Sequence, residues 1–266
     1  VYFDVSKFKN YTKLSGQKLA QKLIGARDEV ITETDKRNPQ DFALWFKRVG
    51  RFQNHIMYWN SPWGDGFPGW HIECSAISTK FLGQPFDIHT GGVDHISVHH
   101  TNEIAQSEGA LSKPLARFWM HGEFLLTSDA KMAKSTGNFF TLSGITEKGA
   151  DPLAFRYLIL TAHYRTKLNF TLESFIAAQQ SLERLQDFVR NIVKNHPAYA
   201  KLRRGKPAFS KTTTSLVPHR ANFEKAIYND LDMPKAIAEI WKLIRMVNRN
   251  PDQYDPKELR KLLADF

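Results

Sequence analysis

Three side chains of the kinds that bind zinc lie within a short central stretch of the sequence. Cys74 is the single cysteine, and His99 follows 25 positions later, with Glu103 four positions beyond it. Residues four apart on a helix share a face, so His99 and Glu103 could bind one ion. A thiolate, an imidazole and a carboxylate form a zinc set that leaves one position open. A buried cysteine and a solvated helix start rich in histidine would give the same spacing.

A second candidate is the loop Lys131-Met-Ala-Lys134-Ser-Thr-Gly-Asn, which follows an expected strand. Its two lysines could neutralise the charge that develops on a leaving phosphate. An ordinary basic surface turn would look the same.

A third candidate is His89-Thr-Gly-Gly92-Val-Asp94-His, at the end of another expected strand. Ligands of open α/β sheets collect at the carboxyl ends of strands, where glycines let backbone approach them closely. Asp94 could bind a ribose hydroxyl. A tight turn without a ligand is the alternative.

The elements that must position these residues alternate between strand and helix. We expect strands at residues 1–5, 86–89 and 123–127, and helices at residues 15–23, 72–81 and 101–111. This alternation is typical of an α/β layered fold.

Beyond residue 150 the pattern becomes helical. Asp151 and Pro152 are a capping residue and a proline suited to the first helical position. Apolar residues then recur at three-to-four spacing from Leu172 to Ile192, which predicts an amphipathic helix. We expect two more helices, at residues 223–229 and 234–249. The sequence therefore predicts an α/β part and a helical part, with a boundary near residues 145–150.

Composition narrows the class of protein. The 266 residues are 42% hydrophobic, which excludes global disorder, and no uncharged apolar run approaches the ~18 residues of a membrane helix. One cysteine excludes an internal disulfide framework and fits a reducing compartment. No basic-then-apolar leader follows Val1, so we expect a cytoplasmic protein. The net charge of +10 favours a polyanionic partner.

Taken in order, several strings of the sequence resemble cysteinyl-tRNA synthetase, a class I aminoacyl-tRNA synthetase. They are Val-Tyr-Phe-Asp-Val-Ser-Lys-Phe (1–8), Gly-Trp-His-Ile-Glu-Cys-Ser-Ala (69–76), His-Thr-Gly-Gly-Val-Asp-His (89–95), His-His-Thr-Asn-Glu-Ile-Ala-Gln-Ser-Glu (99–108) and Lys-Met-Ala-Lys-Ser (131–135). The likeness covers residues 1–175 closely and the remainder loosely. The lysine loop is shared by the wider class I synthetases.

The resemblance implies the second half of a Rossmann-type class I synthetase catalytic domain, followed by an all-α helical bundle. Residues 1–58 would be the remainder of the insertion (connective) region. Residues 59–148 would be the Rossmann core with a Lys-Met-Ser-Lys-Ser-type loop, and residues 149–266 the bundle that contacts tRNA.

The implied activity is ATP-dependent formation of cysteinyl-adenylate and transfer of cysteine to the 3′ end of tRNA(Cys). The implied partners are L-cysteine, ATP with Mg²⁺, Zn²⁺ and tRNA(Cys), with no membrane, and we expect a monomer. Carried over by position, the residues are Cys74, His99 and Glu103 for zinc, Trp70 and His89 for the amino acid, Gly92, Asp94 and Lys134 for ATP, and Lys131 and Lys134 for catalysis. His100 could replace His99 beside Glu103.

Zinc at the pocket would be chemically useful. Serine differs from cysteine by one atom, and a pocket that reads shape alone separates such pairs by only about 1–3 kcal/mol. Zinc binds a thiolate strongly and a neutral hydroxyl poorly. For tRNA, we expect phosphate contacts from Arg184, Lys194, Arg203 and Arg204, unless these charges only solvate exposed helix faces.

The sequence departs from the family in three places. Ala133 replaces the first serine of the lysine loop, the family's His-Ile-Gly-His signature is absent, and no second cysteine supplies a fourth zinc ligand. We therefore expect the sequence to be part of a longer enzyme, and we expect that this part alone cannot form the adenylate. Two alternatives stay open: a cysteine ligase of mycothiol biosynthesis, and a non-catalytic zinc- or tRNA-binding remnant.

Overall fold

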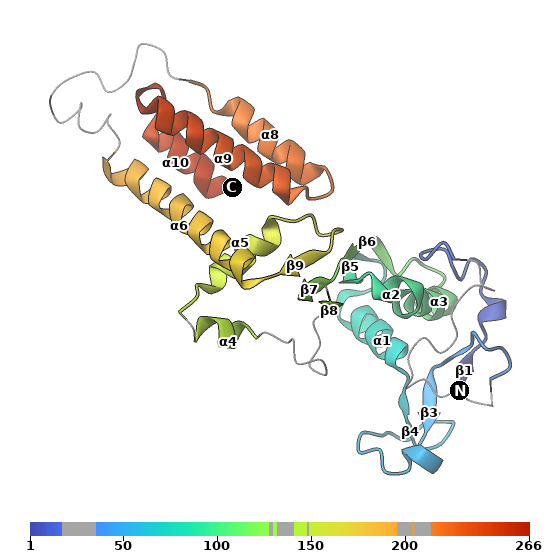
Figure 1. The fold of residues 1–266 in the computed structure, drawn as a ribbon. Coiled ribbons are helices and arrows are strands. Elements are labelled where there is room, and N and C mark those ends of the chain that lie inside the picture. Colours follow the sequence, from blue (N-terminus) through green and yellow to red (C-terminus); the bar gives the residue numbers. More distant parts are fainter. Residues whose placement is uncertain (18–35, 128–129, 132–140, 148, 196–203, 205–213) are drawn as a thin grey trace. The chain divides into compact units, whose positions relative to one another are not determined.

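The computed structural model describes residues 1–17, 36–127, 130–131, 141–147, 149–195, 204 and 214–266 (Figure 1). The chain packs as two compact units, Val1–Gly122 and Glu123–Phe266. Most of the helix expected at residues 15–23 lies outside the described residues, and residues 15–17 are not helical. The predicted division into connective region, Rossmann core and tRNA-binding bundle concerns function and stays a prediction.

The centre of the first unit is a βαβ arrangement. Strand β5 (Phe86–Gly92) runs parallel to β6 (Ala116–Gly122), in a register that pairs Phe86 with Ala116 and Gly92 with Gly122. Parallel neighbours need a crossover connection, and α2 (Asp94–Ser97) with α3 (His99–Leu111) provides it. Helix α1 (Trp70–Leu82) packs against α3.

These elements confirm the pattern expected from the sequence and extend it. The strand expected at 86–89 continues to Gly92, and the helix expected at 101–111 begins at His99. The earlier start of α3 places both His99 and His100 on the helix that carries Glu103.

Two small antiparallel pairs complete the first unit. Strand β1 (Tyr2–Phe3) pairs with β2 (Phe42–Ala43), and β3 (Trp45–Lys47) pairs with β4 (Gly66–Pro68). Short 3₁₀ helices lie at Val5–Lys7 and Gly50–Phe52. An apolar cluster of Val5, Tyr11, Phe42 and Ala105 packs the amino-terminal segment onto α3.

The second unit begins with a three-stranded sheet in the order β8-β7-β9. Strand β7 (Leu125–Thr127) runs antiparallel to β8 (Ala130–Lys131) and parallel to β9 (Leu168–Phe170). Helices α4 (Leu142–Thr146) and α5 (Pro152–Leu160) precede β9 in the chain. As predicted, α5 begins at Pro152 and is capped by the Asp151 side chain, which accepts a hydrogen bond from the Leu153 N–H at 2.8 Å. Strand β9, however, interrupts a region expected to be wholly helical.

The described residues of the second unit beyond β9 are mainly helical. Helix α6 (Leu172–Asn195) is the predicted amphipathic helix, and α8 (Val217–Tyr228) begins earlier than expected, whereas α9 (Met233–Arg249) matches its predicted span. A 3₁₀ turn at Pro251–Gln253 leads to α10 (Pro256–Asp265), which the sequence pattern did not indicate. In the part of the chain that the structure describes, no helix is both long and apolar enough to cross a membrane.

Helices α6, α9 and α10 of the second unit share an apolar cluster. Its buried members are Phe188, Ile192, Leu216, Leu243, Ile244, Val247, Tyr254, Leu259 and Leu262. Leu243 and Leu259 are completely buried. Leu172, on the first turn of α6, is 62% exposed and provides a comparison within the same unit.

We expect Leu243→Ala to lower the free energy of unfolding by about 2–5 kcal/mol, because it removes buried apolar surface and leaves a cavity. Urea unfolding followed by circular dichroism measures the change. The control Leu172→Ala removes the same atoms from an exposed position and should shift the unfolding free energy by less than about 1 kcal/mol. Equal losses in both variants would contradict the assignment of Leu243 to the core.

Candidate metal centre

Helix α3 is unusual because its buried residues are mostly polar. Every residue from His99 to Ser107 is buried, and among these only Ile104 and Ala105 are apolar. Burying polar groups is unfavourable unless they are hydrogen-bonded or bind a ligand. The buried polar residues of this helix therefore indicate a candidate binding site.

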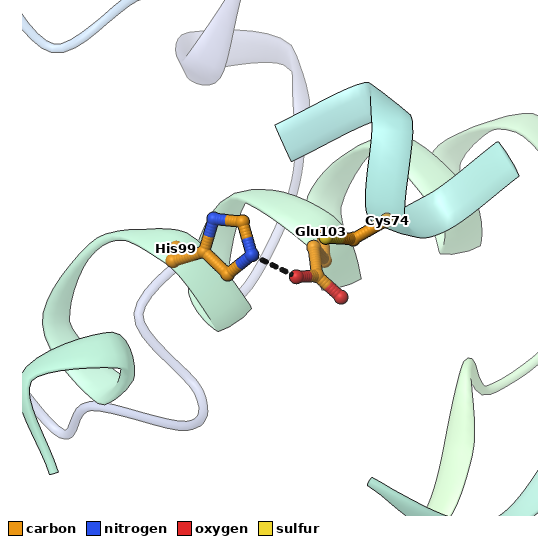
Figure 2. A group of neighbouring side chains, drawn as sticks. All are labelled: Cys74, His99 and Glu103. Atoms are coloured by element: carbon orange, nitrogen blue, oxygen red, sulfur yellow. Dashed lines mark ion pairs between the residues drawn. The ribbon is translucent and has the colours of Figure 1, made fainter. Parts of the chain in front are cut away.

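The three predicted metal ligands converge at this helix. Cys74 comes from α1, while His99 and Glu103 lie one turn apart on α3, and Figure 2 shows the three side chains together. The thiol sulfur, an imidazole nitrogen and a carboxylate oxygen lie within 4.8 Å of one another. His99 Nε2 is 2.6 Å from Glu103 Oε1. The structure thus brings together residues that the sequence related only by spacing.

Glu103 is completely buried, and yet the pKa of its carboxyl group is low. Burial raises the pKa of its carboxyl group, but the hydrogen bond from His89 and the close approach of the His99 imidazole outweigh this effect and lower the pKa to about 2. His89 Nε2 lies 2.7 Å from Oε2, the second carboxylate oxygen. Glu103 is therefore ionised at neutral pH, as a metal ligand must be.

The donor set fits a zinc ion. Glu103 Oε1 is buried and has no partner in hydrogen-bond geometry, although His99 Nε2 is close to it. Burial and the negative charges of Glu103 and Glu73 raise the pKa of the Cys74 thiol. A divalent cation would give the Glu103 oxygen a partner, and it would lower the pKa of the Cys74 thiol by favouring the thiolate. Sulfur, nitrogen and oxygen ligands in one buried group are typical of zinc.

A cluster of histidines surrounds this group. Among the described residues, six histidines take part: His71, His89, His95, His99, His100 and His121. His100 Nδ1 lies 2.8 Å from His121 Nε2, and burial lowers the pKa of His100 to about 3, so this residue is neutral. His89, His100 and Glu103 form a second group whose ligand atoms are within 4.8 Å, so His100 remains an alternative neighbour of Glu103.

Gly91 is required by the packing of this cluster. A Cβ atom at Gly91 would lie 2.5 Å from His100 Cε1 and 2.8 Å from His95 Nδ1. Both distances are shorter than van der Waals contact allows, so a larger residue would displace the rings. Gly91 of the Gly-Gly pair noted in the sequence thus serves the packing of these rings.

The residues expected to contact the amino acid lie beside the metal group. Trp70, the first residue of α1, is 45% exposed and its ring lies 4.2 Å from the His99 ring, centroid to centroid. It could therefore form one wall of a pocket next to the group of Cys74, His99 and Glu103. His89 contacts Glu103, as described above.

The residues expected to contact ATP are only partly described. Gly92 ends β5 and Asp94 begins α2, so both lie at the carboxyl end of a parallel strand, where ligands of such sheets bind. Lys131 ends β8 in the second unit, and Lys134 lies outside the described residues. Their predicted roles stay predictions.

Sequence reasoning missed His71, His95, His121 and Gln106. His71 Nδ1 lies 2.8 Å from His99 Nδ1, and the Gln106 amide donates hydrogen bonds to α1. His71 and Gln106 fall inside the strings that carry the family resemblance, which was the available signal. His121 stands on β6, and only the strand register reveals its position beside His100.

Fold comparison defines the class first. A crystal structure of LeuRS from Agrobacterium radiobacter K84, in a ternary complex with tRNA and LeuAMS, matches 78% of this chain and 30% of its own at a TM-score of 0.56 and 16% identity. The shared architecture is that of a class I synthetase catalytic domain.

Sequence comparison then gives the family. A profile described as tRNA synthetases class I (C) catalytic domain matches residues 1–180, and the chain belongs to this family. It is 41% identical over 92% of its length to the cysteine–tRNA ligase of Treponema denticola and 45% identical over 92% to cysteine–tRNA ligase 1 of Burkholderia lata. The Chlamydia abortus enzyme is 41% identical over 95% of this chain. The chain spans about half the length of these relatives.

We expect the affinity of the chain for zinc to rise with pH. The pKa of Cys74 is raised, so zinc must displace a proton from the thiol, and affinity should grow about tenfold per pH unit for each proton released below that pKa. Competition with a chelator between roughly pH 6 and pH 8 measures this slope. In Cys74→Ser the zinc affinity should fall, and the slope of log affinity against pH should decrease by about 1, because one fewer proton is released. An affinity that does not depend on pH would contradict a thiolate ligand.

Proposed function

We propose that this chain carries the cysteine-recognising part of a cysteine–tRNA ligase, which joins L-cysteine to ATP and transfers it to tRNA(Cys). The observation that supports this most is the convergence of Cys74, His99 and Glu103 beside the exposed ring of Trp70. The matching relatives, which are cysteine–tRNA ligases, support it independently.

Cys74, His99 and Glu103 would hold Zn²⁺, which when bound would supply a Lewis acid that binds the substrate thiolate. The neighbouring residues set the charge and the shape of this proposed site. Glu103 is kept ionised by the hydrogen bond from His89 and by the nearby His99 imidazole, and Trp70 would provide an apolar wall for the amino acid. Because a hydroxyl is a poor zinc ligand, this arrangement would reject serine more strongly than shape alone allows.

We assign nucleotide contacts to two further segments. Gly92 and Asp94 would bind the adenosine part at the end of β5, and Lys131 and Lys134 would stabilise the phosphates, with Mg²⁺, as pyrophosphate leaves. The sequence contains no His-Ile-Gly-His and no second cysteine. We therefore assign cysteine recognition, and not the complete adenylation reaction, to the residues of this chain. A cytoplasmic location and a monomeric state stay predictions.

The test is the binding of amino acids to the zinc-loaded chain, measured by isothermal titration calorimetry. L-cysteine should bind, and L-serine should bind more than about 200-fold more weakly, which exceeds discrimination by shape. The matched control Cys74→Ser should lose this preference. Equal affinities of the zinc-loaded chain for cysteine and serine would refute the proposed pocket.

We further propose that the helical part of the second unit binds tRNA through exposed arginines. Arg184 on α6 is exposed, with its guanidinium 5.9 Å from the ring centre of Trp241, and Arg204 is also exposed. The predicted contact Arg203 lies outside the described residues, and Lys194 lies in the last turn of α6. Exposed cations of this kind bind phosphates and release counterions.

If these arginines contact phosphates, tRNA affinity should fall steeply with salt, and Arg184→Gln/Arg204→Gln should reduce the slope of log affinity against log salt by about 1 for each lost contact. Filter binding at several salt concentrations measures the slope. Arg220→Gln is the control, because Arg220 is already paired with Asp265 and Glu224. A double variant with an unchanged slope would show that these charges only solvate α6 and its neighbouring segment.

A further inference from the structure

A buried glutamine connects α1 and α3 directly behind the candidate metal ligands. Gln106 is 5% exposed and lies on α3 one turn beyond Glu103. Its side-chain Nε2 donates hydrogen bonds to the main-chain oxygen of His71 and to Ser75 Oγ, both at 2.5 Å. The two acceptors stand on either side of Cys74 in α1.

The orientation of the Gln106 amide follows from its partners. A main-chain oxygen can only accept a hydrogen bond, so the group facing His71 must be the NH₂ end of the amide. The other end, Oε1, is buried and has no hydrogen-bond partner among the described residues. An unpaired buried oxygen is unfavourable for folding. The Gln106 side chain thus donates both hydrogen bonds to α1 and leaves its acceptor oxygen, Oε1, without a partner among the described residues.

The same residue is linked to the histidine ligand. His71, whose main-chain oxygen Gln106 binds, places its ring Nδ1 2.8 Å from Nδ1 of His99. The opposite ring nitrogen of His99, Nε2, faces Glu103. Histidines that bind metals are commonly oriented by a hydrogen bond to their second nitrogen. Gln106 therefore supports the helix that carries Cys74 and also the residue that orients His99.

We infer that Gln106 is a positioning residue of the metal centre: by fixing α1 at His71 and Ser75, it sets the separation between Cys74 and the His99–Glu103 pair. This inference rests on the proposed zinc site. Glu103 and His99 lie on one helix and are related by its geometry, whereas Cys74 comes from another helix. The distance between the thiol and the other two ligands consequently depends on contacts between α1 and α3, and the Gln106 amide makes two of them at the level of Cys74.

The chain offers a matched control at Gln84. Its Nε2 also donates to main-chain oxygens, those of Lys113 at 2.6 Å and Ser107 at 3.4 Å, and among the described residues no hydrogen bond joins it to α1. Replacing either glutamine by methionine keeps the length of the side chain and removes its donors. The two variants thus separate a loss of amide hydrogen bonds in general from a loss at the metal centre.

The experiment compares the full chain with Gln106→Met, Gln84→Met and Ser75→Ala. We expect Gln106→Met to bind zinc about 10–100-fold more weakly in chelator competition and to alter the absorption bands of the Co²⁺-substituted chain, including the thiolate-to-cobalt band. Gln84→Met should retain the wild-type zinc affinity and Co²⁺ spectrum. Ser75→Ala, which leaves the bond to His71, should show a smaller loss of affinity.

Circular dichroism and thermal unfolding establish that each variant is folded. Wild-type zinc affinity and a wild-type Co²⁺ spectrum in Gln106→Met would overturn the inference, as would equal losses in Gln106→Met and Gln84→Met. If Gln106→Met does not fold, Ser75→Ala decides: weakened zinc binding supports the positioning role and unchanged binding refutes it. A wild-type chain that binds no zinc would instead refute the proposed metal centre, and the inference with it.

Discussion

The burial of a polar helix is the constraint on which the first unit depends. Each buried polar side chain of α3 requires a partner, because an unpaired one costs about 1–3 kcal/mol. The partners come from separate parts of the chain: the Tyr11 hydroxyl donates to Asn102, His89 of β5 contacts Glu103, and Gln106 donates to α1. The hydrogen bonds that the buried side chains of α3 require therefore hold the amino-terminal segment, β5 and α1 against this helix.

Charge balance explains why this burial suits a metal. Glu103 stays ionised in an environment that disfavours charge, and the Cys74 thiol beside it resists ionisation for the same reason. Two anionic ligands and a divalent cation would together carry no net charge, so binding would remove the electrostatic cost of both groups. The neutral His100 and the other imidazoles add hydrogen-bonding capacity without adding further negative charge.

The sequence predicted the elements of the site better than its contacts. Periodicity located α1, β5 and most of α3, because each has a run long enough to show a pattern. Strand β9 was missed, since Leu168–Phe170 is too short for alternation to be visible. The spacing of Cys74 and His99 suggested a metal but could not show that α1 packs on α3. The pairing of His100 with His121 depends on the register of β5 and β6, which no local pattern encodes.

The register of that sheet also relates the metal centre to the strand end. Gly91 pairs with His121 and Gly92 with Gly122, so the two parallel strands end together and their last residues share one edge. His121 contacts His100 behind this edge, while Asp94 is exposed just beyond it. The short α2 connects the strand end to α3 within a few residues. A ligand at the edge would therefore contact the same βαβ unit that carries His99 and Glu103, because the His95 and His100 imidazoles pack against Gly91 at the strand end.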